Sequence, residues 1–157
     1  MAIRKYEVIP ATLEHAKALQ GRLRKSDLQE IEASTGRDPD KSLERAWRVS
    51  ELCWAGLIDG RVVALFGVAR LSVLSETGSP WLLGSEEMES AAIEVGRRSR
   101  QYVREMKRHF VHLENFIDAR QETSIRWLKW CGFTIDPAAP WGVLRLPFHR
   151  FWMNCHV

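Results

Sequence analysis

The Asp59-Gly60 pair, flanked by two apolar runs, constrains the fold of this chain more than any other local feature. The run over residues 53–58 precedes the pair, and the run over residues 61–70, rich in Val, Ala, Leu and Phe, follows it. A type I′ turn needs a positive φ at both central residues, and Asp-Gly accepts that conformation. The sequence therefore predicts an antiparallel hairpin over residues 53–70.

The residues before the hairpin indicate one strand and two helices. Ile3–Ile9 predicts a strand that Pro10 ends. Thr12 is the expected N-cap of a helix that runs until the polar stretch 34–39, because apolar residues recur at helical spacing behind it, namely Leu13, Ala16, Leu19 and Leu23. Pro39 then opens a second, short helix that ends near Val49.

The residues after the hairpin alternate between strands and helices. A short strand, Trp81–Leu83, ends at Gly84, and Gly84 or Ser85 caps a long helix from about Glu87 to Phe110. A helix connects that strand to a buried-type strand, Val111–Ile117, so the two strands are expected to be parallel. A short helix, Glu122–Trp130, is expected next, and it ends before Gly132, which is expected to take the left-handed conformation. Two closing strands follow, Phe133–Ile135 and Gly142–Leu146.

Composition narrows the class of protein. A chain of 157 residues with 45% apolar and 27% charged residues is expected to form one globular domain over residues 1–157. The longest apolar stretch, Val62–Phe66, is far shorter than the roughly 18 residues of a membrane-spanning helix, and no signal peptide is visible. Three cysteines, odd in number and far apart, favour a reducing compartment, so we expect a cytoplasmic protein without membrane partners.

The segment Gln121–Phe133 (QETSIRWLKWCGF) carries the strongest motif in the chain. It is similar to the late helix-plus-Gly-Phe signature of the GCN5-related N-acetyltransferases (GNAT), and the order of elements resembles that fold along the whole chain. More narrowly, the chain resembles acetyltransferase-like proteins of tailed phages and prophages, related to a phage internal virion protein. The resemblance implies an α/β (α+β) fold with a mixed, mostly antiparallel sheet of about six to seven strands and helices on both faces.

The same resemblance implies a site for acetyl-CoA or another acyl-CoA. The parallel strands would separate at their ends, the exposed backbone of Leu82 and Leu83 would pair with the pantetheine arm, and Trp81 would be a further cofactor-binding residue. Gly84 and Ser85 would lie beside the thioester and the phosphates, with Gln121 and Ser124 contributing from the short helix; helix capping is the alternative role for these last two residues. Glu86 or Glu87 would deprotonate an unknown amine acceptor, or would simply favour the helix N-terminus.

Three departures from the family pattern bear on activity. The leading Asn is Gln121, the Tyr that protonates the departing thiolate is replaced by Leu128, and the glycine-rich phosphate loop is replaced by residues 85–91 with three glutamates. These departures favour weak or absent turnover of ordinary acetyl-CoA. Two classes therefore stay open: an N-acyltransferase of phage or prophage type, and a non-catalytic phage structural or assembly protein, virion-associated, that keeps the fold. A phage protein or a second copy of the chain would then be its partner.

Other site chemistries find little support in the sequence. His149, Cys155 and His156 match no zinc-ligand spacing, so no metal site is expected. The basic run 97–108 is interrupted by apolar residues at helical spacing, which indicates the solvated face of a core helix. Together with a net charge of +3, this makes a nucleic-acid partner an unfavoured hypothesis.

Overall fold

The computed structural model describes residues 4–155. Its helices and strands are interspersed along the chain, with runs of three helices and of three strands, which is a mixed α/β arrangement. In chain order they are β1 (Tyr6–Pro10), α1 (Leu13–Leu19), α2 (Lys25–Ser34), α3 (Pro39–Val49), β2 (Ser50–Ile58), β3 (Arg61–Arg70), β4 (Thr77–Gly84), η1 (Glu86–Ala91), α4 (Ala92–Lys107), β5 (His112–Asp118), α5 (Glu122–Trp130), β6 (Thr134–Ile135), β7 (Ala139–Trp141) and β8 (Leu146–Asn154).

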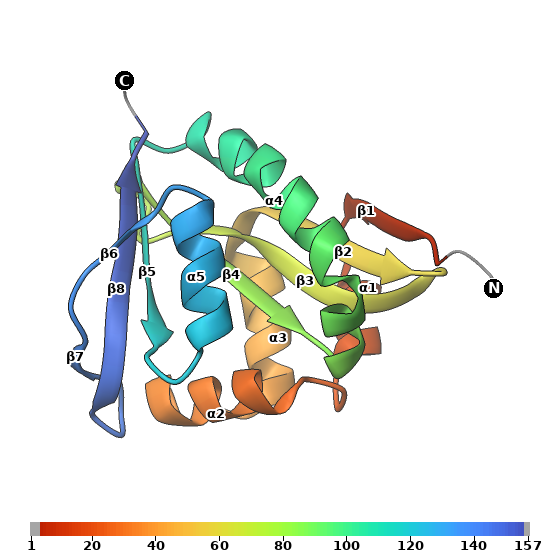
Figure 1. Ribbon diagram of the computed structural model, residues 1–157, viewed down its shortest axis with the longest axis horizontal. Coiled ribbons are helices and arrows are strands. Elements are labelled where there is room, and N and C mark those ends of the chain that lie inside the picture. Colours follow the sequence, from red (N-terminus) through yellow and green to blue (C-terminus); the bar gives the residue numbers. More distant parts are fainter. Residues whose placement is uncertain (1–3, 156–157) are drawn as a thin grey trace.

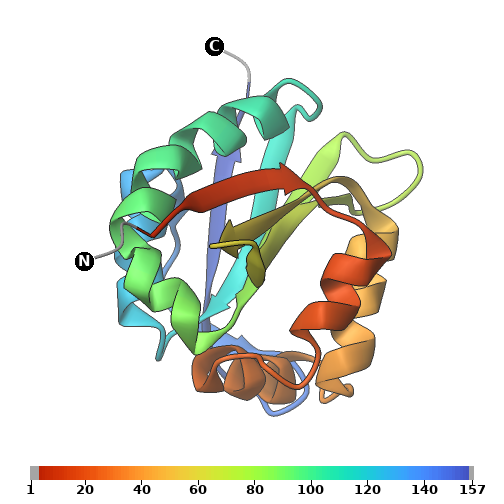
Figure 2. The same cartoon turned by 90° about the vertical axis from the view of Figure 1, so that its right-hand side faces the viewer.

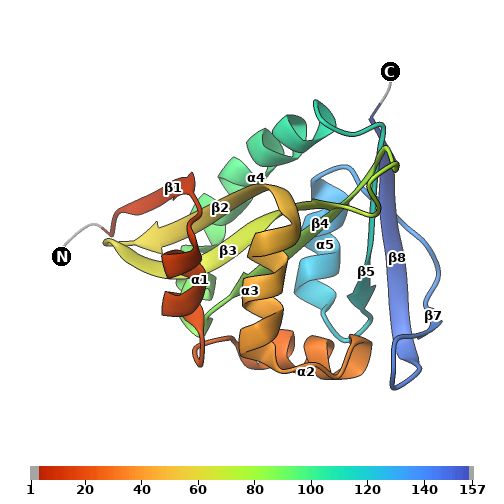
Figure 3. The ribbon, with the colours of Figure 1, turned by 180° about the vertical axis from the view of Figure 1, so that it is seen from behind.

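The strands form a single mixed sheet with helices on both faces (Figure 1). Within the described residues the sheet has eight strands in the order β1-β2-β3-β4-β5-β8-β6, and β7 pairs with β8. Every pair is antiparallel except β4 and β5. Helices α4 and α5 cover one face and α1 and α3 the other (Figures 2 and 3), while α2 crosses the carboxyl ends of β4 and β5.

The core is thickest around β3, because this strand has helices over both of its faces. Val63, Ala64 and Leu65 are all fully buried, which explains why the strand reads as a continuous apolar run rather than an alternating one. Leu65 packs with α1 and α3, whereas Val63 and Ala64 pack with residues before α4. A further cluster joins α4, α5, β5 and β8. No helix in residues 4–155 is long and apolar enough to span a bilayer.

Several predictions from the sequence are confirmed. Asp59 and Gly60 have φ values of 49° and 81°, as the turn between β2 and β3 requires. Helix α5 has the predicted bounds, and Gly132 follows it with φ of 102°. Helix α3 begins at Pro39, with Asp38 as its N-cap. The predicted parallel pair is also present, since Thr77 and Gly78 of β4 pair with β5.

Three predictions for the N-terminal half and the middle of the chain are wrong in detail. The helix expected from Leu13 to the polar stretch is two helices, because Gly21 turns the chain with φ of 73° and the Arg24 N–H donates to Gly84 O. The strand expected at 81–83 begins earlier, at Thr77. The long helix begins as a 3₁₀ turn, and the hydroxyl of Ser85 makes no capping bond. The part of the first predicted strand before Arg4 lies outside the described residues.

The end of the chain also differs from the prediction. Of the predicted strand Gly142–Leu146, residues 142–145 form a turn and only Leu146 belongs to a strand, β8, because Gly142 and Arg145 have φ values of 78° and 54°. The long closing strand is β8, which carries the aromatic residues Phe148, Phe151 and Trp152 and pairs with β5 over seven residues. The aromatic tail is therefore part of this chain's own sheet. The described residues hold no cluster of metal ligands; His156 lies outside them.

Candidate functional site

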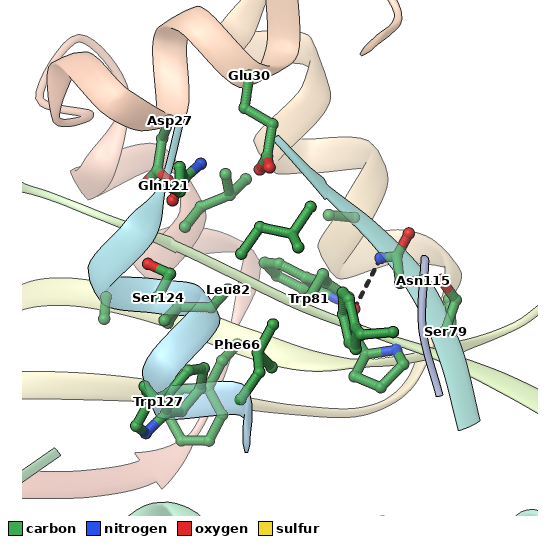
Figure 4. Close-up of a pocket in the computed structure, with 18 of the residues that line it drawn as sticks. Asp27, Glu30, Phe66, Ser79, Trp81, Leu82, Asn115, Gln121, Ser124 and Trp127 are labelled. Atoms are coloured by element: carbon green, nitrogen blue, oxygen red, sulfur yellow. Dashed lines mark hydrogen bonds between the residues drawn. The ribbon is translucent and has the colours of Figure 1, made fainter. Parts of the chain in front are cut away.

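Strands β4 and β5 separate immediately after they begin to pair. Their parallel register covers only Thr77 with His112 and Gly78 with Leu113. Two residues further along each strand, the Asn115 side chain bridges the widening gap, because its Nδ2 donates to Pro80 O at 2.7 Å (Figure 4). Beyond Asn115 the register contains no pair between the two strands. The sheet is thus open at the carboxyl ends of its only parallel pair.

The open edge of β4 exposes the hydrogen-bonding groups of one residue. Two hydrogen bonds mark the ends of the β3–β4 register: Ser85 N donates to Val63 O, and Leu71 N donates to Thr77 O. Because hydrogen bonding alternates along an antiparallel pair, the backbone groups of odd-numbered β4 residues bond to β3 and those of even-numbered residues face the gap. Of these, Pro80 has no N–H and its carbonyl accepts from Asn115. Leu82 N–H and C=O have no hydrogen-bond partner among the described residues.

Gly84, at the end of β4, is fully engaged by α2. Its N–H donates to Asp27 Oδ2 at 2.9 Å, and its carbonyl accepts from Arg24 N at 2.8 Å. Arg24 also forms a bidentate pair with Asp27, whose side chain is buried. Burial raises the pKa of the Asp27 carboxyl above its usual value, and the Arg24 guanidinium opposes this only in part. This clamp fixes the N-terminal end of α2 against the open edge.

A cavity of about 360 Å³ passes through the gap and reaches both faces of the sheet. Its floor is β4, from Ser79 to Leu83. On one side it is walled by α2 and α3 and on the other by α4 and α5, so the lining includes residues from four helices. Most of the lining is apolar; polar side chains along it include Asp27, Glu30, Ser99, Tyr102, Gln121 and Ser124. A volume of this size suits a small organic ligand.

Glu30 is the carboxylate best suited to move a proton in this cavity. It lies in the middle of α2, and its Oε1 accepts from the Asp118 N–H at 2.8 Å. Burial raises the pKa of Glu30 to about 7, and the nearby Asp27 and Asp118 carboxylates add to this, although the Asp118 N–H opposes it. The side chain points toward the cavity in Figure 4. A carboxyl with a pKa near neutrality can both accept and release a proton at pH 7.

Helix α5 supplies the next polar groups. Gln121 is its N-cap position and reaches Ser26 O through Nε2 at 3.5 Å, a weak contact. Ser124, in the first turn, lines the cavity, and its hydroxyl makes no hydrogen bond within the described part of the chain. From the facing helix α4, Tyr102 lines the same wall beside Trp54 and Phe66. Burial raises the pKa of its phenol, which keeps it protonated at neutral pH.

Glu86 and Glu87 lie away from this cavity. Glu86 Oε1 accepts from Lys25 N at 2.9 Å, and Glu87 Oε1 lies 3.2 Å from Arg22 and 3.3 Å from Arg61. Neither glutamate lines the cavity, and neither do Gly84 and Ser85. The buried Ser85 hydroxyl has no hydrogen-bond partner in the described structure. The cavity thus brings together Trp81, Leu82, Leu83, Gln121 and Ser124 of the residues proposed from sequence, and leaves the loop residues 84–87 outside.

Glu30 was missed by the sequence reasoning. It sits on a polar-looking helix among other acids, Asp27 and Glu32, and nothing local separates it from a solvent-exposed glutamate. Only the approach of β5, which places the Asp118 N–H against its carboxylate, distinguishes it. Asn115 was missed for the same reason, because its role depends on the register between β4 and β5.

A scan of the sequence against protein-family models gives no match, and a search of curated proteins gives no significant one. Solved structures do match. The chain is similar to an N-acetyltransferase from Staphylococcus aureus Mu50 (14% identity, TM-score 0.71, covering 97% of this chain and 99% of that one). It is also similar to an acetyltransferase of the GNAT family from Streptococcus pneumoniae (8% identity, TM-score 0.65, covering 96% of this chain and 99% of that one). A putative acetyltransferase from Salmonella typhimurium, solved with its cofactor acetyl-CoA, matches as well (12% identity, TM-score 0.68, covering 98% of this chain and 95% of that one).

These similarities, at identities of 8 to 14%, define the fold. The mixed, mostly antiparallel sheet with one parallel pair that opens at its carboxyl ends is the GNAT fold, here with eight strands in the described residues rather than the six to seven expected.

Proposed function

We propose that this chain is an N-acyltransferase that transfers an acyl group from acyl-CoA to an amine. One observation carries the proposal: the cavity through the open sheet places the unpaired backbone groups of Leu82 and the carboxylate of Glu30 along one passage. A fold alone does not define an activity, and many functions share one scaffold. Here the site itself offers both a binding edge and a proton acceptor.

The residues present fit a pantetheine arm. Such an arm is slim, largely apolar and carries amides, and an amide can pair with a strand edge as an added strand would. Leu82 presents one free donor and one free acceptor at that edge, and Leu83, whose backbone groups face β3, does not. This refines the expectation from sequence, which included both residues. The glutamates of η1 oppose phosphates less than their number suggests, because Glu87 lies within ion-pair distance of Arg22 and Arg61. Glu86 accepts a hydrogen bond from the backbone N–H of Lys25.

The acceptor is proposed to enter from the α2–α3 side, where Glu30 lies. Acyl-CoA would supply the acyl group as a thioester. Glu30 would take a proton from the acceptor ammonium, so that the neutral amine nitrogen can form the new bond to the acyl carbon while the thioester C–S bond breaks and CoA leaves as the thiolate. Leu82 N–H is the free backbone donor available to a carbonyl oxygen at the open edge. From the α4–α5 side, Ser124 and Tyr102 offer hydroxyl protons to the departing thiolate. Leu128 stands at the position of the tyrosine that protonates this thiolate in the GNAT family.

Calorimetry with CoA tests the binding half of this proposal. We expect wild-type protein to bind CoA with micromolar affinity and to show a raised melting temperature, because a ligand of the native state stabilises it. Replacing Glu86 and Glu87 by Gln should strengthen binding, and more so at low salt, if their charges still oppose the phosphates. Absence of binding in both proteins, with melting curves that show a folded chain, would overturn the proposal.

The pH dependence of transfer tests the role of Glu30. Acyl transfer, followed by release of the free thiol, should rise with pH through an apparent pKa near 7 in wild-type protein. Glu30→Gln should lower kcat by about 100-fold or more and remove that inflection, whereas Glu32→Gln, on the same helix, should change neither. Retention of the inflection in the Glu30 variant would assign the base elsewhere, with Glu86 and Glu87 the next residues to substitute.

A non-catalytic phage assembly protein is the second candidate. One observation favours it: the loop between β3 and β4 exposes Leu71, Val73 and Leu74, of which the last two are 93% and 94% exposed. Apolar side chains at an exposed loop tip are typical of contact surfaces. Origin in a phage or prophage, a cytoplasmic or virion-associated location and a protein partner belong to this proposal. Copurification of the chain with virions, lost when Val73 and Leu74 are replaced by Ser, would support it over the enzyme.

A further inference from the structure

Four basic side chains surround the end of the cavity on the α2–α3 side. Arg37 lies in the loop after α2, and Lys41, Arg45 and Arg48 lie on α3. Together with Glu44 they line a hollow of about 300 Å³ at the surface. Arg37 and Arg45 line both this hollow and the cavity through the sheet, so the two spaces share a wall. We refer to Arg37, Lys41, Arg45 and Arg48 as the basic mouth.

The charges of the basic mouth are poorly balanced by the protein. Arg48 lies 3.9 Å from Glu44 Oε2, which is a long and exposed contact. Arg37, Lys41 and Arg45 have no carboxylate within ion-pair distance in the described part of the chain. Four positive charges therefore face one negative charge at the entrance.

The nearest acids in the sequence are committed elsewhere. Asp38 Oδ1 accepts from the N–H groups of Asp40 and Lys41, as the N-cap of α3. Asp40 Oδ1 accepts from Gly21 N, and Glu44 Oε1 accepts from Gln20 Nε2. These hydrogen bonds direct the carboxylates toward backbone groups and toward the α1–α2 loop. An anion that enters the basic mouth would meet guanidinium groups whose charges are available.

The cavity is polarised along its length. Its more buried part holds Glu30 and the Asp27–Arg24 pair, whose charges offset each other, and its exposed part on the α2–α3 side holds Arg37 and Arg45. A molecule with an ammonium group at one end and an anion at the other matches this arrangement, whereas a polycation would meet repulsion at the entrance. Arginine is suited to the outer role because its planar fork binds a carboxylate or a phosphoryl group through two parallel hydrogen bonds.

We infer that the acceptor is an amine that also carries a carboxylate or phosphoryl group, and that Arg37 and Arg45 bind this anion while the ammonium faces Glu30. The inference rests on the proposed acyl-transfer function, which places the acceptor on this side. It makes Arg37 and Arg45 specificity-determining residues. It also assigns a function to a basic surface that the net charge of the chain does not predict.

Matched acceptor pairs test the inference. The first pair is glycine and glycinamide, and the second is 2-aminoethyl phosphate and ethanolamine; spermidine serves as a polycation. Acetyl transfer from acetyl-CoA is compared in wild-type protein, in Arg37→Gln/Arg45→Gln, and in Arg104→Gln/Arg108→Gln, which removes two charges from the exposed C-terminal part of α4. We expect the anionic member of at least one pair to have a kcat/KM at least tenfold above its uncharged partner.

The variant results identify the residues. In Arg37→Gln/Arg45→Gln the advantage of the anionic acceptor over its uncharged partner should fall to threefold or less, through a rise in the KM of the anionic acceptor. The α4 control should keep the full advantage. An advantage in the glycine pair would identify a carboxylate as the recognised anion, and an advantage in the 2-aminoethyl phosphate pair would identify a phosphoryl group. An equal kcat/KM for both members of each pair, or an advantage that survives in the double variant, would overturn the inference.

A binding measurement separates this inference from the proposed function. Calorimetric titration of the same four acceptors into protein saturated with CoA reports anion recognition without turnover. Binding of an anionic member to wild type, lost in Arg37→Gln/Arg45→Gln and kept in the α4 control, supports the inference. If CoA binds and no anionic acceptor does, the inference fails and the proposed function stands. If CoA itself does not bind, the proposed function fails.

Discussion

Glu30→Gln offers a test of the site that needs no substrate. The unfolded chain carries Glu30 with its ordinary pKa of 4.5, whereas the folded protein holds it at about 7. Between these two values the folded state keeps a proton that the unfolded chain has released. Unfolding therefore releases a proton in this window, and the contribution of Glu30 to stability falls as pH rises from about 4.5 to 7 and is constant above it.

The magnitude follows from the two pKa values. Each pKa unit corresponds to about 1.4 kcal/mol, and most of the shift takes effect between pH 5 and pH 8, so Glu30 costs the wild-type protein about 2–3 kcal/mol of unfolding free energy over that range. Glutamine has the same shape and no titrating proton, and its carbonyl oxygen can still accept from Asp118 N. The variant is therefore expected to gain about 2–3 kcal/mol relative to wild type over that pH range.

Urea denaturation at a series of pH values measures this difference. The free energies of unfolding of wild type, Glu30→Gln and Glu32→Gln are compared at constant ionic strength, and other groups that titrate cancel between the curves. Glu32 is exposed on the same helix, so its substitution is expected to give a curve parallel to that of wild type. Parallel curves for Glu30→Gln and wild type would show that the Glu30 carboxyl titrates normally, and would remove the argument for it as a proton acceptor.

Three further substitutions test the packing around the site. Asp27→Ala leaves the buried Arg24 guanidinium and the Gly84 N–H without their acceptor, so the free energy of unfolding measured in urea should fall by about 3–5 kcal/mol. A fall below about 1 kcal/mol would mean that the contacts between Arg24, Asp27 and Gly84 do not form in solution. Gly67→Ala would place a Cβ 2.3 Å from Leu52 O, and its melting temperature should fall by an amount that reflects about 2 kcal/mol. Gly96→Ala, inside α4 with open space around it, should instead gain about 1 kcal/mol, and a loss would indicate a contact that the structure does not show.

The sequence by itself determined the elements whose conformation depends on neighbouring residues. The Asp59-Gly60 turn, the start of α3 at Pro39 and the Gly132 end of α5 each depend on backbone conformations that a few residues define. The pattern of Gln121–Phe133, together with the order of the elements, indicated the fold because both resemble the GNAT family. These features could be predicted because the interactions that stabilise them span only a few residues.

The tertiary structure decided the features that depend on distant segments meeting. The break between α1 and α2 follows from Arg24 bonding to the end of β4, sixty residues away in the sequence. The closing strand lies at Leu146–Asn154 because β5 supplies a partner edge for it. Likewise, Leu82 is distinguished from Leu83 only by the register of β3 and β4, and Glu30 from its neighbours only by the approach of Asp118. Burial and pairing of this kind are properties of the assembled sheet, so the groups proposed to carry the chemistry could be found only there.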